Sequence, residues 1–229
     1  MENDYWTPVT TDVSIISANG QRIVLRNVPG LKDKQGNISI SIVDAIRTEQ
    51  EYIAKEHGIN PREILELLIL QAPVRFSKCG PGYLEQKFRF NKILFYIWKK
   101  LEEQGLDAVV FEKFSAARAG PIPIHLKEDL NELEEKGLIT QSIIRDKKEI
   151  PRGEGGLEEI RPKGSLRCEL TNEGAQIAKS IWDKTPPEIR DIVKEVKETL
   201  FFVDATILKE KVRKDYPEYQ KHYTELDDE

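Results

Sequence analysis

The pattern of hydrophobic and polar positions divides the chain into a β-rich beginning and a helical remainder. Two short runs rich in valine and isoleucine, residues 13–20 and 21–28, meet at the dipeptide Asn19-Gly20. Asn-Gly is a strong hairpin signal because both residues tolerate the positive φ angles of tight turns. A third run, residues 38–43, follows a second cluster of turn-forming residues. The pattern therefore predicts three strands in a small N-terminal sheet.

Residues 44–72 show helical periodicity, interrupted by Gly58. The dipeptide Asn60-Pro61 supplies a capping residue followed by a proline suited to the first helical turn. We therefore expect two helices, the second ending before Pro73. The spacing of small and apolar residues also fits a helix-turn-helix. Because the second helix is too apolar to face a DNA groove, a helical pair in the core or in a dimer interface is favoured.

Residues 73–89 contain two glycines and two prolines. Such a composition is typical of a linker or an ordered loop, and it predicts a domain boundary. We expect an N-terminal unit of strands and a helical pair over residues 1–75. The remaining unit then covers residues 76–229.

From Phe90 to Gly105 the chain carries a strong amphipathic stripe, which predicts a helix that faces the core. A short strand, or a transition between strand and helix, is expected over residues 107–114, and a loop rich in glycine and proline follows. A leucine-rich helix over residues 126–136 follows, ending at Gly137. The next elements are two strands joined by a long polar tip, residues 138–146 and 165–171, and three helices that begin at Thr171, Thr185 and Asp204.

The order of elements over residues 90–170 is that of a winged helix. In this fold the helix before the hairpin often reads DNA, and the hairpin forms the wing. The predicted fold class is therefore a helix-rich α+β protein. It has a winged-helix core, an N-terminal extension of strands and helices, and C-terminal helices. An α+β domain of another type is the alternative.

Three short motifs resemble the Panacea group of antitoxin-like domains and related winged-helix proteins of prokaryotes. They are a first-helix motif of the K-L-x-Y type, a loop motif of the F-x-A-x-x-x-G-P type and a closing V-x-x-x-Y-P pattern. The matching residues are Lys92, Leu94, Tyr96, Phe114, Ala116, Gly120, Pro121, Val212, Tyr216 and Pro217. The resemblance covers residues 90–217 and leaves residues 1–89 unmatched. It implies a regulatory or antitoxin-like role and carries over no catalytic residue.

Composition excludes several classes of protein. The chain has 229 residues and a formal net charge of −5 at pH 7. No apolar run approaches the roughly 20 residues that a membrane helix needs, and the acidic N-terminus does not resemble a signal peptide. Cys79 and Cys168 are far apart, and the three histidines are scattered, so neither a disulfide framework nor a zinc spacing is present. We expect a soluble, cytoplasmic protein without metal or cofactor.

Basic residues gather in two segments of this acidic chain. Residues 75–100 hold seven lysines and arginines against one glutamate, and residues 145–167 hold seven against five acids. Clusters of this kind neutralise DNA phosphates, although a solvated helix face and loop give the same pattern. The predicted nucleic-acid-binding residues are Arg75, Lys78, Lys87, Arg89, Lys92, Lys99, Lys100, Arg145, Lys147, Lys148, Arg152, Arg161 and Lys163.

The helix that would read DNA bases is acidic. Residues 126–136 contain two lysines and five acids, and carboxylates facing phosphates repel them at short range. DNA would therefore have to be bound by the wing or by the segment at residues 75–100. Alternatively, the acidic helix contacts a basic protein partner.

Other candidate chemistry is sparse. Aromatic residues interleave with the basic ones near Phe95 and Trp98, a pattern that can stack single-stranded bases but at helical spacing indicates core. His125 precedes two acids and Cys79 lies in a basic loop, but neither has a catalytic partner nearby in the sequence. The sequence thus predicts a non-enzymatic DNA-binding regulator, acting as a homodimer. The alternative is an antitoxin-like module that binds a protein, and an enzyme ranks third.

Overall fold

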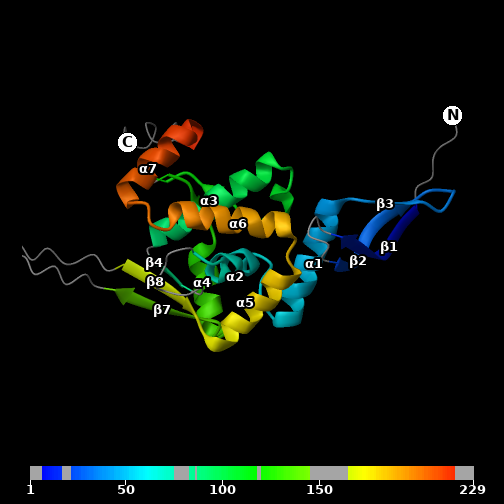
Figure 1. The fold of residues 1–229 in the computed structure, drawn as a ribbon, viewed down its shortest axis with the longest axis horizontal. Coiled ribbons are helices and arrows are strands. Elements are labelled where there is room, and N and C mark those ends of the chain that lie inside the picture. Colours follow the sequence, from blue (N-terminus) through cyan, green and yellow to red (C-terminus); the bar gives the residue numbers. More distant parts are fainter. Residues whose placement is uncertain are drawn as a thin grey trace, which may run out of the picture.

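The computed structural model describes residues 7–16, 22–74, 83–85, 87–117, 120–144 and 165–219, which form a mixed, helix-rich α/β arrangement with small antiparallel sheets (Figure 1). The strands are β1 (Thr7–Ile16), β2 (Arg22–Lys32), β3 (Ile38–Ile40), β4 (Tyr83–Glu85), β5 (Phe114–Ser115), β6 (Ile122–Pro123), β7 (Ile139–Ile144) and β8 (Ser165–Leu170). The α-helices are α1 (Ile42–His57), α2 (Glu63–Gln71), α3 (Lys87–Glu103), α4 (Leu126–Glu135), α5 (Asn172–Lys184), α6 (Pro187–Leu200) and α7 (Ala205–Asp215). The 3-10 helices are η1 (Asp107–Val109) and η2 (Pro217–Tyr219).

The N-terminal sheet has the strand order β1-β2-β3 and lies at one end of the molecule (Figure 1). The predicted antiparallel pair is confirmed, whereas Asn19-Gly20 lies outside the described residues. Leu25 and Val28 of β2 are buried in a small cluster with Ala45 of α1. The third strand is shorter than predicted because the Ser41 hydroxyl accepts a hydrogen bond from the Asp44 amide and so begins α1.

The two helices predicted in residues 44–72 are confirmed as α1 and α2. Gly58 ends α1 with a left-handed φ of 64°. Asn60 Oδ1 then accepts from the Arg62 amide at 3.1 Å, and Glu63 Oε2 accepts from the Asn60 amide at 2.6 Å. This reciprocal pair resembles a capping box, and it sets the start of α2. The helix ends before Pro73, as expected.

The central sheet has the order β4-β8-β7, with all pairs antiparallel. Leu84 of β4 and Gln141 of β7 both pair with Cys168 of β8. The interpretation of residues 73–89 as a linker is therefore wrong at β4, which contributes an edge strand. A strand of three residues carries too little periodicity to be recognised, and its partner lies some eighty positions later in the chain.

The segment at residues 107–123 also differs from the prediction. Over residues 107–114, where a strand or a transition between strand and helix was expected, the helical part η1 comes first and the short strand β5 begins only at Phe114. Among the described strands, β5 pairs with β6 alone, in a two-stranded sheet separate from the predicted hairpin. The strand that joins the hairpin is thus β4, which precedes α3.

The later helices begin and end close to their predicted positions. The Thr171 hydroxyl accepts from the Gly174 amide and caps α5, and the Asp204 carboxylate caps α7. Gly137 follows α4 with a φ of 71°. Position 174 requires glycine because a Cβ there would lie 1.8 Å from the Leu138 carbonyl oxygen. The backbone of Gly174, at the start of α5, therefore lies directly against Leu138, the residue before β7.

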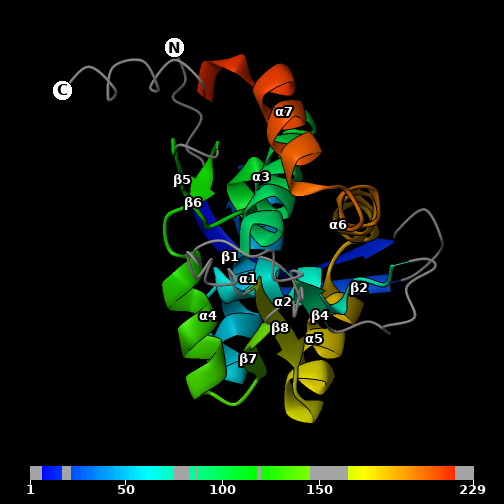
Figure 2. The same cartoon turned by 90° about the vertical axis from the view of Figure 1, so that its left-hand side faces the viewer.

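The core surrounds α2, which lies in the middle of the helices (Figures 1 and 2). Leu67, Leu68, Ile69 and Leu70 are fully buried, and the same hydrophobic cluster includes residues of α1 and of α3 to α7. α2 packs against α5 and α6, so the core is continuous across position 75. The division into units at residue 75 stays a prediction. None of the described helices is long and apolar enough to cross a bilayer.

Candidate functional site

Lys92 was expected on a basic surface, and this expectation is wrong. Its side chain is fully buried, and its ammonium donates a hydrogen bond to the Pro121 carbonyl oxygen at 2.8 Å. Burial lowers the pKa of Lys92 to about 8. Gly120 has a φ of +84°, and a Cβ at this position would lie 3.2 Å from Lys92 Nζ. The backbone of this loop therefore passes close to the ammonium. The hydrogen bond from Lys92 therefore links α3 to the loop before β6.

The other cations of α3 contact neighbouring parts of the chain. Arg89 Nη2 donates to the Val203 carbonyl oxygen at 3.0 Å. Lys99 pairs with Glu102 at 2.7 Å, and Lys100 pairs with Glu195 at 2.6 Å. Lys87, at the start of the helix, is exposed. The remaining predicted DNA contacts lie outside the described residues: Arg75, Lys78, Arg145, Lys147, Lys148, Arg152, Arg161 and Lys163.

Helix α4 lies at the periphery of the molecule (Figure 2) and separates apolar and charged residues onto opposite faces. Its leucines face the core, as predicted: Leu126, Leu130 and Leu133. The exposed side chains of the helix are Lys127, Glu128, Asn131, Glu134 and Glu135, with Glu132 partly exposed. This outward surface of α4, which we call the acidic face, carries four carboxylates and one lysine.

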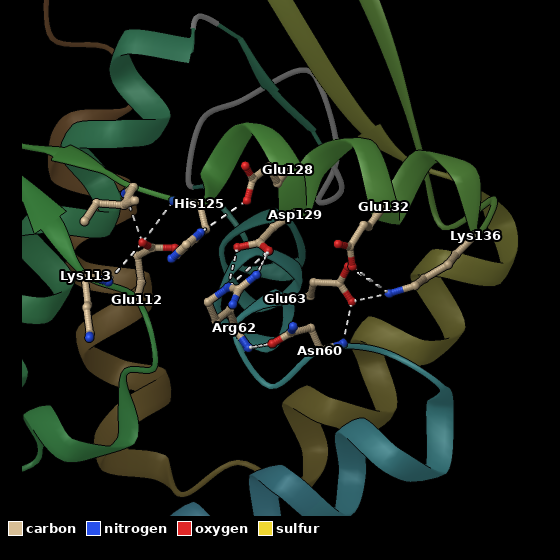
Figure 3. A network of polar contacts seen from close by, with 11 residues as sticks. Asn60, Arg62, Glu63, Glu112, Lys113, His125, Glu128, Asp129, Glu132 and Lys136 are labelled. Atoms are coloured by element: carbon tan, nitrogen blue, oxygen red, sulfur yellow. Dashed lines mark hydrogen bonds and ion pairs between the residues drawn. The ribbon is translucent and has the colours of Figure 1, made fainter.

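A network of polar contacts fixes α4 against α2 (Figure 3). The Arg62 guanidinium contacts both oxygens of Asp129, with Nη2 to Oδ1 at 2.8 Å and Nε to Oδ2 at 3.1 Å. Asp129 is completely buried, and its hydrogen bonds raise the pKa of Arg62 further. A bidentate pair of this kind fixes orientation as well as distance. It therefore determines which side of α4 faces solvent.

A second pair holds the other end of α4. Lys136 Nζ donates to both oxygens of the buried Glu63, at 2.9 and 2.7 Å, and lies 3.6 Å from Glu132 (Figure 3). Burial raises the pKa of Glu63, and the hydrogen bond from Lys136 opposes that shift. Lys136 is itself exposed and lies beside Glu132, so it offsets part of the negative charge at this end of the acidic face.

Glu112 organises the chain just before α4. Its Oε1 accepts hydrogen bonds from the amides of Lys113, Ile124 and His125, at 2.9, 3.0 and 3.2 Å (Figure 3). The His125 ring lies 3.2 Å from Glu128, at the entrance to the helix. His125 is thus a partly exposed residue beside the first turn of α4. Of the two cysteines, Cys79 lies outside the described residues, and burial raises the pKa of Cys168 to about 12.

The aromatic residues near Phe95 belong to the core, as helical spacing indicated. The Phe95 ring is surrounded by those of Trp98, Phe114, Tyr216 and Tyr219, at centroid distances of 5.0 to 5.7 Å. We call this group, together with Tyr96, the aromatic cluster. It joins α3, β5 and the chain after α7.

Lys197 of α6 is a second buried lysine, and its burial was not predicted from the sequence. Its Nζ donates to the carbonyl oxygens of Leu70 and Ala72, at 3.1 and 2.7 Å, and so caps the end of α2. Burial lowers the pKa of Lys197 to about 7. Its position at helical spacing from Ile189 and Val193 was a signal, because both of these residues face the core.

This burial predicts a measurable pH dependence. Between the folded pKa of about 7 and the ordinary value of 10.5, the unfolded chain binds more protons at Lys197 than the folded chain does. The free energy of unfolding of the wild type, relative to a Lys197→Met variant, should therefore rise with pH by up to about 1.4 kcal/mol per pH unit. Urea unfolding at pH 7, 8 and 9 measures this difference.

Tyr96 and Tyr216, whose pKa values burial raises, add an opposite dependence above pH 10 to both proteins, and this contribution cancels in the difference. The matched control is Lys194→Met on the same helix, which should show no such slope relative to the wild type. A wild-type minus Lys197→Met difference that stays constant with pH would contradict the prediction.

No family model, curated protein or solved structure matches this chain.

Proposed function

We propose that this chain is a non-enzymatic interaction protein, antitoxin-like in character, that binds a basic protein partner through α4. The observation that carries the proposal is the acidic face of α4, held outward by the pairs Arg62–Asp129 and Lys136–Glu63. Opposite charges across an interface speed association and select the partner. The low cysteine content is in keeping with a cytoplasmic protein.

The winged-helix part of the proposal rests on topology. The chain order α2, β4, α3, α4, β7, β8 and the sheet order β4-β8-β7 support it, because the first strand of a winged helix pairs with the last. In this assignment α2 is the first helix, α4 takes the place of the reading helix, and β7 and β8 form the base of the wing.

The positions of the three motifs support the antitoxin-like part. Lys92 of the first motif donates to Pro121 of the second. Position 120 lies close to both Lys92 and Val212 of the third. The Tyr96 ring meets that of Tyr216 at 5.5 Å. Motif residues far apart in the sequence thus share one region of the structure, which is expected if the three motifs act together as one structural unit.

Electrostatics favour a protein partner over DNA. A helix in the reading position that presents mainly carboxylates repels phosphates, and this repulsion is weakly screened at short range. On α3, Lys92 is buried, and Lys99 and Lys100 already pair with carboxylates. DNA binding is the second candidate, favoured by the exposed Lys87 and by the lysines and arginines of residues 145–167, which stand among five acids.

The test compares two double charge reversals that change the net charge equally. Glu128→Lys with Glu135→Lys alters the acidic face, whereas Glu173→Lys with Glu210→Lys alters exposed glutamates of α5 and α7. Tagged forms are purified from the source organism, and the captured partner is then purified and titrated against each form. We expect the acidic-face variant to bind at least about tenfold more weakly and the control to bind like the wild type. Equal affinity in all three forms would overturn the proposal.

Duplex DNA is tested in parallel by fluorescence anisotropy at two salt concentrations. We expect no saturable binding at low salt. Binding that weakens steeply with salt and is unaffected or strengthened in the acidic-face variant would favour the DNA-binding candidate instead.

A further inference from the structure

Three carboxylates from separate parts of the chain meet beneath α4. They are Glu66 of α2, Glu112 of the segment before β5 and Asp129 of α4, and one oxygen from each lies within 4.8 Å of the other two. All three side chains are buried, with exposed fractions of 0%, 6% and 0%. We call this group the carboxylate cluster. It lies behind the polar network, on the core side of α4.

The charges of the carboxylate cluster are incompletely balanced. Arg62 supplies one positive charge, on Asp129. Glu112 Oε1 accepts three backbone N–H groups, but its Oε2 has no hydrogen-bond partner in the described part of the chain. Neither oxygen of Glu66 has such a partner there either. Buried ionised carboxylates without partners cost several kcal/mol each, so the arrangement calls for either a bound cation or a proton.

A small cavity lies beside Glu112 of the carboxylate cluster. It has a volume of about 10 Å³ and is lined in part by Gln50, Arg62 and Glu112. This is about the space of one water molecule. Gln50 is nine-tenths buried, and its side-chain oxygen also has no hydrogen-bond partner among the described residues. The cavity is lined mainly by apolar side chains, so the unpartnered oxygens of Gln50 and Glu112 are the polar groups there that a water molecule bound to an ion could contact.

We propose that Glu66, Glu112 and Asp129 bind one divalent cation of the oxygen-preferring class, Mg²⁺, Mn²⁺ or Ca²⁺. Three carboxylates and one guanidinium leave two negative charges, which a divalent ion neutralises. Oxygen ligands at about 2.1 to 2.5 Å from an ion lie up to about 4 to 5 Å apart, in agreement with the spacing of these oxygens. The absence of sulfur and imidazole from the ligand set disfavours zinc.

The site joins three segments that are distant in sequence, and its role is structural. Because its ligands are buried, the ion exchanges with solvent more slowly than an ion on surface carboxylates does. By linking α2, the segment before β5 and α4, it stabilises the position of the acidic face. The competing arrangement is a proton on Glu66, whose pKa is raised well above 4.5 by burial and by the charges of Asp129 and Glu112.

The experiment uses the full chain after treatment with EDTA. Thermal unfolding and isothermal titration are carried out with MgCl₂, MnCl₂ and CaCl₂ separately, for the wild type and for Glu66→Gln. The control Glu173→Gln removes the same charge from the exposed start of α5. We expect one of the three ions to bind with a stoichiometry of one and to raise the melting temperature of the wild type and the control. Glu66→Gln should weaken this binding at least about tenfold.

Two results would overturn the proposal. The first is that none of the three ions binds the wild type and that Glu66→Gln melts at a higher temperature than the wild type at pH 8. A proton on Glu66 then balances the charge of the cluster. If Glu66→Gln binds the ion as the wild type does, the ion occupies surface carboxylates. Circular dichroism of both variants confirms that they are folded, and glutamine has nearly the size of the glutamic acid that it replaces.

Discussion

Replacement of Phe95 by alanine is expected to lower the free energy of unfolding by about 3 to 5 kcal/mol. The ring is completely buried, and it contacts the rings of Trp98, Phe114, Tyr216 and Tyr219 edge-on or at a tilt. Truncation removes its burial, leaves a cavity and abolishes several favourable aromatic pairs at once. The helix α7 and the turn η2 depend on these rings for their attachment to α3. Urea unfolding followed by tryptophan fluorescence measures the loss.

Phe202→Ala is the matched control. This phenylalanine is 64% exposed and meets the ring of Phe201 at 4.9 Å. Its truncation should cost less than about 1 kcal/mol. Hydrogen exchange adds a local readout, because Phe95→Ala should increase exchange in α7 before the rest of the chain opens. A loss below about 1.5 kcal/mol for Phe95→Ala would show that the aromatic cluster is not the principal link between α3 and α7.

Replacement of Arg62 by alanine is expected to cost about 3 to 5 kcal/mol of folding free energy. Its guanidinium is the partner of Asp129, which is completely buried, and the carboxylate cluster lies directly behind that pair. Removing the cation leaves a buried negative charge without its partner, which costs more than the ion pair itself contributes. Arg62→Lys should recover only part of the loss, because an ammonium cannot reproduce the two-point contact with the carboxylate.

Arg47→Ala is the corresponding control. Arg47 lies 3.8 Å from Glu51 in an ion pair whose side chains are about half exposed, so its removal should cost about 1 kcal/mol or less. Urea unfolding at pH 7 compares the three variants with the wild type. Equal costs for Arg62→Ala and Arg47→Ala would mean that solvent reaches Asp129, and the proposed role of the pair in orienting α4 would fail.

The proposed interaction and the proposed cation depend on the same helix but are tested separately. The acidic-face reversal changes residues that point to solvent, whereas Glu66→Gln changes a buried residue of α2. If the protein binds its partner but no divalent cation, the proposed interaction stands and the proposed cation site is wrong. The opposite result would leave a structural ion in a protein whose partner surface lies elsewhere.

The sequence alone predicted the elements that local signals determine. The Val- and Ile-rich runs predicted the pair β1 and β2, although β1 begins at Thr7, before its run, and Gly58 and Asn60 separated α1 from α2. The leucine stripe of α4 and the Thr171 cap of α5 were also recognised, because spacing and capping operate within a few residues. The burial of Glu66 and Lys197 was not predicted, even though each lies at helical spacing from apolar residues of its helix.

Tertiary structure decided which of these elements meet and what their charged residues do. β4 is a strand because β8 pairs with it, and Lys92 is buried because Gly120 allows the Pro121 carbonyl to approach its ammonium. Glu66, Glu112 and Asp129 lie 46 and 17 residues apart along the chain, and only the packing of α4 on α2 brings their carboxylates together. Local signals act over one or two helical turns, whereas charge partners and burial depend on contacts between distant segments, so the former were readable in this sequence and the latter were not.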